Sequence, residues 1–332
     1  MRILLSLLIA VGFLACKQPQ TPDEITIAGN AFGTSYGVKY FGEVAEAPQI
    51  KKGIDSVVAA VNQSLSTYIP QSDISKINRG DTTVVVDAMF RDVFTLSRKL
   101  NKATSGYFDP TVGTLRNAYG FGDTEALGTL DEPTLDSLMQ YVGWSKVQLQ
   151  EDGTISKTAS TIYFDFNAIA KGYGVDRVAA YMGSKGFNNY LIDIGGEIVA
   201  AGTNLNKEQR WTVGIENLDS KVTDRTASVL VSLTDKAMAG SGNYRKNRVD
   251  KATGKQYVHT INPLTGSAER SDVLSATIIA DDCATADAWA TSCMAMGLER
   301  SKEALKGQNI EAYLVYDGGV FMTPGFNQYI QK

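Results

Sequence analysis

Histidine is nearly absent from this sequence, and that scarcity limits the chemistry the chain can perform. His259 is the only histidine among 332 residues, so any site that needs two imidazoles is excluded. Imidazole is the side chain that titrates near neutral pH when unperturbed, which makes His259 the first candidate for a general base. It lies in residues 257–266, where an alternating run predicts a strand that delivers polar groups to an Asn-Pro turn. The alternative is a structural, half-buried ring.

Cysteine is also scarce, and a disulfide within the body of the chain is excluded. Cys283 and Cys293 fall on one predicted helix. Ten residues of helix span about 15 Å, which is too long for a disulfide. We therefore interpret both thiols as buried packing residues rather than as a redox pair or a metal site.

Clusters of lysine and arginine are missing, which argues against nucleic acid as a partner. The formal net charge is −4, whereas nucleic-acid-binding domains gather basic residues on one face. Walker loops, CxxC pairs and HExxH helices are absent as well. With 43% hydrophobic and 20% charged residues, the composition is that of an ordinary globular protein.

The first residues have the character of an export signal. Arg2 precedes an apolar run over residues 3–15 that is too short to span a bilayer as a helix. Because the run ends at Cys16, we predict a lipoprotein signal over residues 1–15, an acylated Cys16 that anchors the chain to a membrane, and a polar tether over 16–24. This places the protein in a bacterial cell envelope, facing the periplasm or the exterior. The alternative is an ordinary secretory signal in which Cys16 is incidental.

Runs of strands broken by isolated helices predict an α+β fold over residues 25–332, with mixed and antiparallel sheets and flanking helices. Apolar residues at helical spacing predict helices over residues 50–65, 88–103, 135–142, 168–185 and 284–296. Alternating or apolar runs predict strands over residues 25–27, 35–41, 84–86, 147–149, 155–157, 162–166, 190–194, 198–201, 211–216, 228–233, 255–261, 274–279 and 312–316.

The sharpest chemical signal is the helix predicted over residues 284–296. Asp287 and Thr291 are four residues apart and share one helix face. A carboxylate and a hydroxyl are hard oxygen ligands that suit Mg²⁺, although they fill only part of its octahedral shell. The alternative is an acid at the helix edge and a threonine bonded back to its own backbone.

A second signal lies at the junction before the helix predicted from Ala168. A strand ends at Asp165, and the backbone groups of such a junction suit an anionic ligand. Lys171, one turn into the helix, can act as a point charge on phosphate. Two glycines lie inside the helix rather than before it, so a dinucleotide-binding fingerprint is rejected. The alternative is a normal helix with an exposed lysine.

Three further segments are candidates for ligand contact. Residues 66–68 begin a polar loop that leads into a short helix, and residues 108–122 enclose a short helix with a glycine and aromatic rim. Residues 239–245 are rich in small residues and predict a turn that brings backbone close to a ligand.

Taken in order, the segments resemble the ApbE family of FAD:protein FMN transferases, in its bacterial lipoprotein form. The resemblance covers nearly all of the chain after the signal, and it implies a two-lobed catalytic unit. The motifs that carry it are GTSYGVKY (33–40), LSTYIPQSDISKIN (65–78), FDPTVGTLRNAYGFG (108–122), FDFNAIAKGYGVDRV (164–178), NYLIDIGGEIVAAG (189–202), WTVGIE (211–216), AMAGSGNYR (237–245), YVHTINPLTG (257–266) and ADAWATSCMAMG (286–297).

The resemblance implies a reaction and a set of site residues. FAD is bound with its diphosphate on Mg²⁺, a Thr or Ser hydroxyl of an acceptor protein attacks the FMN-side phosphorus, FMN becomes linked as a phosphoester, and AMP leaves. It implies that Asp287, Thr291 and the backbone carbonyl of Ala168 hold Mg²⁺, and that His259 and Asp287 are catalytic. The implied FAD contacts are Phe32, Ser66, Thr67, Tyr68, Asp109, Pro110, Thr111, Asp165, Lys171 and Ile261.

The sequence departs from the family pattern at three acidic positions. Ala290, Asn262 and Asn243 stand where family members commonly have Asp. The metal shell is therefore leaner, and His259 loses one acidic partner. The base can be His259, or alternatively Asp165 or Asp287.

The implied partners are extracytoplasmic subunits of sodium-translocating NADH:quinone reductases or of Rnf-type electron-transfer complexes. Two other functions fit the same residues. One is Mg²⁺-dependent hydrolysis of FAD to FMN and AMP, with water as the acceptor. The other is a non-catalytic FAD-binding lipoprotein.

Overall fold

The computed structural model describes residues 22–127, 130–218, 220, 226–243, 247–249, 254 and 256–331. The predicted signal segment, Cys16 and the first part of the tether lie outside the described residues. Within the described part of the chain, no helix combines the length and the apolar character needed to cross a membrane.

The framework is an eight-stranded sheet in the order β1-β2-β5-β6-β9-β12-β13-β14. All neighbouring strands in it are antiparallel. Among the described residues, the one parallel contact is an isolated bridge between Val112 and Tyr163. An antiparallel sheet flanked by helices confirms the predicted α+β fold. The strands are β1 (Asp23–Ala31), β2 (Thr34–Gly42), β5 (Tyr190–Ile194), β6 (Glu197–Ala201), β9 (Lys236–Gly242), β12 (Val273–Ala280), β13 (Glu311–Tyr316) and β14 (Gly319–Met322).

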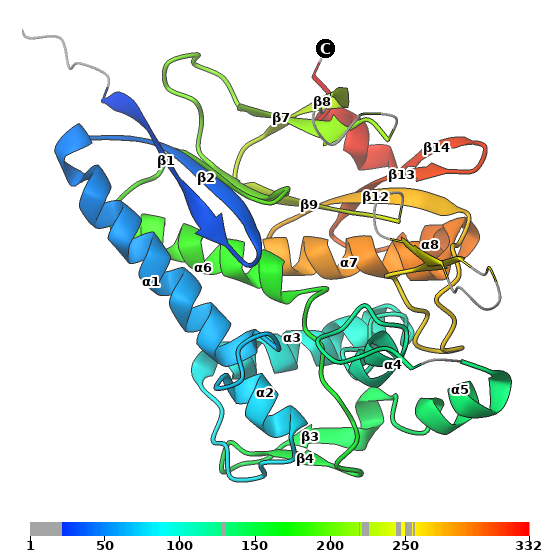
Figure 1. Ribbon diagram of the computed structural model, residues 1–332. Helices are drawn as coiled ribbons and strands as arrows, with labels where there is room; N and C mark the ends of the chain where they lie inside the picture. Colours follow the sequence, from blue (N-terminus) through cyan, green and yellow to red (C-terminus); the bar gives the residue numbers. More distant parts are fainter. Residues whose placement is uncertain are drawn as a thin grey trace, which may run out of the picture.

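The two faces of this sheet are covered differently. Helices α6 (Ala170–Ser184) and α7 (Cys283–Met296) lie beneath it in Figure 1, with α1 (Ala47–Leu65) crossing below α6. The hairpin of β7 (Trp211–Glu216) and β8 (Ala227–Leu233) lies above it, as does the short 3-10 helix η3 (Pro324–Gln328). The main hydrophobic core fills the helix side, and a smaller cluster fills the hairpin side.

A second part of the molecule lies beneath the α6–α7 layer in both ribbon views. It is centred on five buried rings, in which the centroids of neighbouring rings are 4.7 to 6.5 Å apart, namely Phe90, Phe94, Trp144, Phe164 and Phe166. The two parts correspond to the two lobes that the resemblance implies. The elements of this lower part are α2 (Asp73–Asn78), α3 (Ala88–Ala103), α4 (Gly113–Ala118), α5 (Glu132–Met139), η2 (Trp144–Lys146), β3 (Val147–Leu149) and β4 (Ile155–Lys157).

The predicted helices occur at or near their expected residues. Helix α3 spans residues 88–103 as predicted, because Phe90, Val93 and Phe94 share one buried face and Asp87 accepts a hydrogen bond from the Phe90 amide at its N-terminus. The helix expected from residue 168 begins two residues later, at Ala170. Elements without a predicted counterpart are the 3-10 turns η1 (Val44–Glu46), η2 and η3, the strands β9, β10 (Asn247–Val249) and β14, and the helix α8 (Leu298–Leu305).

Three predicted strands are wrong in whole or in part. Residues 84–86 and 162–166 are not part of any β-ladder, since each segment connects other elements and makes only isolated backbone hydrogen bonds. The Val86 amide donates to the Gly153 carbonyl, and the Asp165 amide donates to the Pro110 carbonyl. The strand expected over residues 255–261 is the shorter β11 (Gln256–Val258), which ends before His259, and residues 259–261 line a cavity instead.

The turn expected over residues 239–245 is also wrong in its first half. Residues 239–242 continue β9, in register with β12 as far as Gly242. The small residues there resemble turn formers, but pairing with β12 and packing of α7 on the strand override their local preference. Residues 244 and 245 lie outside the described residues.

Helices α6 and α7 approach each other closely at their N-terminal ends. A Cβ added to Gly172 would lie 2.3 Å from the backbone oxygen of Cys283, so only glycine fits. The carboxylate of Asp176, one turn further along α6, accepts hydrogen bonds from the amides of Cys283 and Ala284 at 2.8 and 2.9 Å. Because these amides are the first of α7, the Asp176 side chain, which belongs to α6, caps the N-terminus of α7.

We predict that Gly172→Ala lowers the free energy of unfolding by about 1–3 kcal/mol, because the added methyl group must push two backbones apart. Gly183→Ala is the matched control on the same helix. A Cβ at Gly183 meets no atom within 4 Å, so that change should raise stability by at most about 1 kcal/mol. Urea unfolding followed by circular dichroism measures both. Equal effects of the two substitutions would contradict the close-packing argument.

Candidate active site

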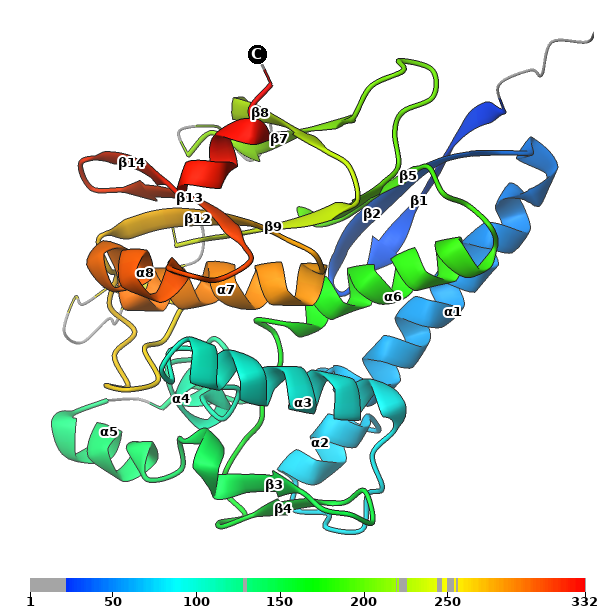
Figure 2. The ribbon, with the colours of Figure 1, turned by 180° about the vertical axis from the view of Figure 1, so that it is seen from behind.

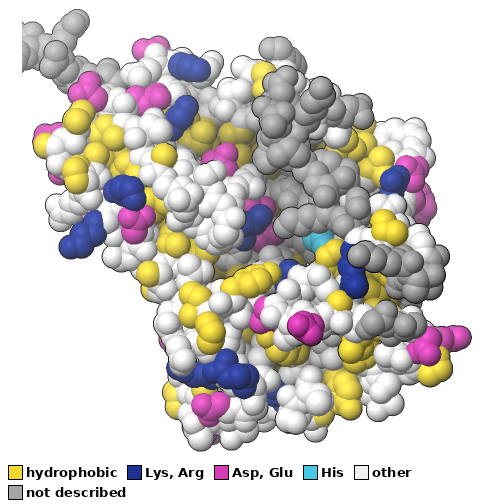
Figure 3. All heavy atoms as spheres, in the orientation of Figure 1, with side chains coloured by type: hydrophobic (Ala, Val, Ile, Leu, Met, Phe, Trp, Pro, Cys, Tyr) yellow, Lys and Arg dark blue, Asp and Glu magenta, His cyan; other side chains and the backbone are white. Residues whose placement is uncertain are grey.

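One cavity collects most of the predicted site residues. It has a volume of about 790 Å³ and is lined by residues from both parts of the molecule. The only histidine, cyan in Figure 3, is visible where the upper and lower parts meet. The predicted residues that line the cavity are Phe32, Ser66, Tyr68, Asp109, Pro110, Asp165, Ala168, Lys171, His259, Ile261, Asp287 and Thr291.

Two predicted contacts, Thr67 and Thr111, are buried and are not among the residues that line the cavity. The Thr111 hydroxyl donates to Asp109 Oδ1 at 2.6 Å and accepts from the Gly143 amide at 2.7 Å. The other oxygen of Asp109 accepts from the Trp144 amide at 2.8 Å. In this conformation these side chains therefore hold the shape of the loop, while Asp109 and Pro110 form part of the wall.

The polar end of the cavity is built where α6 and α7 begin. Asp287 is 5% exposed, and its Oδ2 accepts a hydrogen bond from the Gly172 amide at 3.0 Å. Its other carboxylate oxygen accepts no hydrogen bond from the residues that the structure describes. Thr291 follows one turn later on α7, and Ala168 lies in the turn that precedes α6. A carboxylate, a hydroxyl and a backbone carbonyl, which are the oxygen ligands that Mg²⁺ prefers, thus belong to residues that line the same cavity.

A buried carboxylate that the sequence reasoning missed, Glu197, completes this end. Its side chain is 2% exposed, and Lys171 Nζ lies 2.6 Å from its Oε2. Burial raises the pKa of both Glu197 and Asp287, while the ammonium group of Lys171 opposes that rise. Burial alone would lower the pKa of Lys171, but the two carboxylates outweigh it and raise that pKa.

The charges at this end favour a cation. With all three groups ionised, two carboxylates face one ammonium group, and the excess negative charge is buried. Among the described residues, neither this end of the cavity nor any other place brings together three His, Cys, Asp or Glu side chains that could hold a metal ion. A bound Mg²⁺ would therefore rely on hydroxyl, backbone, ligand or water oxygens for most of its shell, which suits a hard ion.

His259 is carried by a segment that the lower part of the molecule holds in place. The Tyr119 hydroxyl donates to the Gly266 carbonyl at 3.0 Å, and Arg248 Nη1 donates to the Tyr119 carbonyl at 2.6 Å. Asn262 Oδ1 accepts from the Leu264 amide at 3.0 Å, so this residue stabilises the turn after His259. The departure from Asp at position 262 leaves that turn intact.

The opposite side of the cavity contains an ion pair that the sequence reasoning also missed. Arg116, on α4, forms a short ion pair with Asp165 and donates to the Tyr68 hydroxyl at 3.3 Å. Burial alone would lower the pKa of Arg116, but the Asp165 carboxylate raises it above its ordinary value. Tyr68 is 59% exposed, and its hydroxyl is the part of the ring that contacts Arg116.

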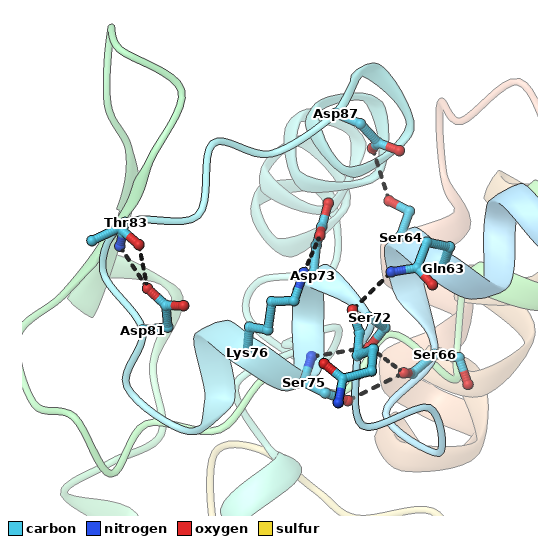
Figure 4. Close-up of polar contacts among 11 residues, drawn as sticks. Gln63, Ser64, Ser66, Ser72, Asp73, Ser75, Lys76, Asp81, Thr83 and Asp87 are labelled. Atoms are coloured by element: carbon cyan, nitrogen blue, oxygen red, sulfur yellow. Dashed lines mark hydrogen bonds and ion pairs between the residues drawn. The ribbon is translucent and has the colours of Figure 1, made fainter.

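The loop that carries Ser66 and Tyr68 is held by hydroxyl groups of α2, as Figure 4 shows. Ser72 Oγ donates to the Ser66 carbonyl at 2.6 Å and also accepts from the Ser75 amide. Ser75 Oγ donates to the carbonyls of Ser66 and Thr67. The backbone of the loop is therefore preorganised without help from a ligand.

Phe32 occupies a strained position on the cavity wall. Its φ of +52° is in the left-handed region, in the two-residue turn between β1 and β2. The ring lies over α6, where a Cβ on Gly174 would come within 2.4 Å of it. Gly174, which the sequence reasoning set aside with the rejected dinucleotide fingerprint, is thus required by the packing of Phe32.

Two signals in the sequence could have indicated the missed residues. Glu197 follows Gly195-Gly196 at the end of a buried strand, where an acid is unexpected unless it has a partner. Arg116 lies inside the segment 108–122 that was already a candidate. Its partner Asp165 is 49 residues away in the chain, so only the fold reveals the pair.

Comparisons with known proteins agree with one another. The sequence model of the ApbE family matches residues 32–314. The FAD:protein FMN transferase of Haemophilus influenzae is 32% identical over 330 residues, which is 95% of this chain and 93% of that protein. The FAD:protein FMN transferase of Vibrio cholerae is 32% identical over 333 residues, which is 98% of this chain and 95% of that protein. The solved structure of the flavin transferase ApbE from Vibrio cholerae superposes with a TM-score of 0.82 at 30% identity, covering 92% of this chain and 99% of that one.

We predict that Arg116→Ala lowers the free energy of unfolding by about 2–4 kcal/mol, because it leaves the buried Asp165 carboxylate without its partner. The double variant Arg116→Ala/Asp165→Asn should recover at least about 1 kcal/mol of that loss. A double-mutant cycle in urea unfolding, completed with Asp165→Asn alone, measures the coupling. Additive losses would show that the pair contributes no net stability.

Proposed function

This chain belongs to the ApbE family, and we propose that it is a FAD:protein FMN transferase that acts through a Mg²⁺-assisted phosphoryl-type transfer. One cavity supports this function. It brings together oxygen atoms that could bind a metal, a lysine that forms an ion pair with Glu197, and the only histidine, from segments between Phe32 and Thr291. Transfer of this kind needs positioning and charge neutralisation more than covalent catalysis. The cavity offers groups for both.

In the proposed reaction, a Thr or Ser hydroxyl oxygen of the acceptor attacks the FMN-side phosphorus of FAD. A new oxygen–phosphorus bond forms, the bond from that phosphorus to the bridging oxygen breaks, and AMP leaves with the bridging oxygen. The hydroxyl proton passes to a base, for which His259 is the best candidate because Asp165 is engaged by Arg116 and Asp287 faces the cation site. Lys171 provides a positive charge for a phosphate oxygen.

The resident cation would be Mg²⁺, held by Asp287, Thr291 and the backbone carbonyl of Ala168. When bound, it would neutralise charge on the diphosphate. The remainder of FAD would lie against Phe32, Ser66, Tyr68, Asp109, Pro110, Asp165 and Ile261, with Thr67 and Thr111 supporting the same loops from behind.

We propose that the enzyme acts outside the cytoplasm, anchored to a membrane through an acylated Cys16. Its acceptors would be extracytoplasmic subunits of sodium-translocating NADH:quinone reductases or Rnf-type complexes. A tether of polar residues after Cys16 would let the catalytic part reach such membrane-bound partners.

One experiment separates the proposed function from its alternatives. The protein is incubated with FAD, Mg²⁺ and a candidate acceptor domain, and flavin fluorescence is then measured on the denatured acceptor together with free AMP. Labelled acceptor with stoichiometric AMP is expected. AMP without labelled acceptor would mean hydrolysis, and tight FAD retention without AMP would mean a non-catalytic FAD-binding protein.

We predict that Asp287→Asn abolishes FMN transfer and its dependence on Mg²⁺, because the main charged ligand is lost. Titration of Mg²⁺ against the initial rate of acceptor labelling measures this. Asp281→Asn is the matched control, since Asp281 is exposed, lies two residues before the start of α7 and does not line the cavity. An Asp287→Asn variant with full activity and an unchanged Mg²⁺ dependence would show that the metal assignment is wrong.

We predict that His259→Ala lowers the rate constant of transfer by about 10²–10⁴-fold, the usual contribution of a general base. The dissociation constant of FAD should change little, because proton removal occurs only in the reaction. Single-turnover labelling and equilibrium FAD titration measure the two quantities. Equal losses in both would make His259 a binding residue rather than the base.

A further inference from the structure

A second cavity, of about 860 Å³, lies on the opposite face of the sheet from the helices. We call it the far-face groove and define it by Ser35, Gly37, Lys39, Asp193 and Thr212. The alternation of strand β2 fixes its position: Tyr36, Val38 and Tyr40 are buried in the main core. Residues 35, 37 and 39 therefore face the other side, toward the β7–β8 hairpin.

The far-face groove and the candidate active site meet at the same residues. Lys171, Glu197 and residues 240–242 line both cavities. The groove thus reaches the ion pair that stands beside Asp287. A molecule lying in the groove would have access to the polar end of the active site from the face opposite the helices.

The meeting point is an opening in the sheet. Strand β6 begins at Glu197, and its register with β9 ends where Ile198 faces Met238. Strand β9 continues to Gly242 with β12 as its partner on one side. Along residues 239–242, no described strand pairs with the other edge of β9. Unpaired strand edges of this kind bind extended polypeptides by backbone hydrogen bonds.

We propose that the far-face groove is the docking site of the acceptor polypeptide, which lies in extended form along the free edge of β9 and presents its Ser or Thr hydroxyl where the groove opens into the active-site cavity. This inference rests on the proposed function, which requires two substrates to meet at one phosphorus. FAD approaches through the active-site cavity, and the acceptor approaches through the groove. The lining favours a polar polypeptide, because it combines charges of both signs with hydroxyl groups.

Gly37→Phe tests the proposal by filling the groove. A Cβ at Gly37 meets no atom within 4 Å, and Gly37 does not line the active-site cavity. With an acceptor domain that the wild-type enzyme labels, the variant should raise the acceptor KM, or lower kcat/KM, by at least about tenfold. The dissociation constant of FAD and the thermal midpoint should stay as in the wild type.

Two further variants control for non-specific effects. Gly183→Phe adds the same ring at an exposed position near the end of helix α6, where a Cβ also meets no atom within 4 Å, and it should leave labelling unchanged. Ser35→Trp obstructs the groove from an exposed position and should reproduce the effect of Gly37→Phe. Unchanged acceptor kinetics in folded Gly37→Phe and Ser35→Trp variants would overturn the proposal. A loss of FAD affinity in these variants would also overturn it, because the groove would then bind the nucleotide.

A measurement on the wild-type protein does not depend on how the variants fold. The FAD-loaded enzyme is mixed with the same acceptor domain carrying Ala or Val in place of its target hydroxyl residue, and amide hydrogen exchange is followed. Slower exchange over residues 239–242 is expected, and unchanged exchange there at saturating acceptor would overturn the proposal. Failure of the wild-type enzyme to label any acceptor would instead count against the proposed function.

Discussion

The buried charges at the start of α6 and α7 are the constraint on which the rest of the site depends. Asp287 and Glu197 are almost completely removed from water, and Lys171 forms an ion pair with Glu197 beside them. Such an arrangement is costly unless a further positive charge arrives. A bound cation of the kind proposed above would relieve this cost, and the active-site cavity is lined by all three of these residues.

Close packing makes that charge cluster possible. Gly172 lets α6 approach the first turn of α7, and its amide donates to Asp287. Asp176 then caps α7 from the neighbouring helix. The same junction brings Lys171 to the start of β6, where Glu197 is the first residue of the strand. One glycine contact and one capping carboxylate thus align the groups that would hold the diphosphate.

The lower part of the molecule supplies the remaining wall. Its aromatic core supports α3 and the loops around Asp109 and Asp165, while the contacts of Tyr119 and Arg248 fasten the His259 segment across the cavity. His259 and Asp287 therefore come from segments that different parts of the molecule position. The hydrogen bonds of Tyr119 and Arg248 therefore hold the His259 segment against the lower part of the molecule.

The sequence by itself determined the α+β class, the long amphipathic helices and the pairing of Asp287 with Thr291, because these follow from periodicities of two and of 3.6 residues within one segment. Family motifs also indicated most residues of the cavity wall. Only the tertiary structure decided which distant groups meet: the ion pairs Arg116–Asp165 and Lys171–Glu197, the interlobe contact of Arg248, and the strand at residues 239–242 that local composition predicts as a turn. The physical reason is that charge pairing and sheet pairing depend on separation in space, which local periodicity does not encode.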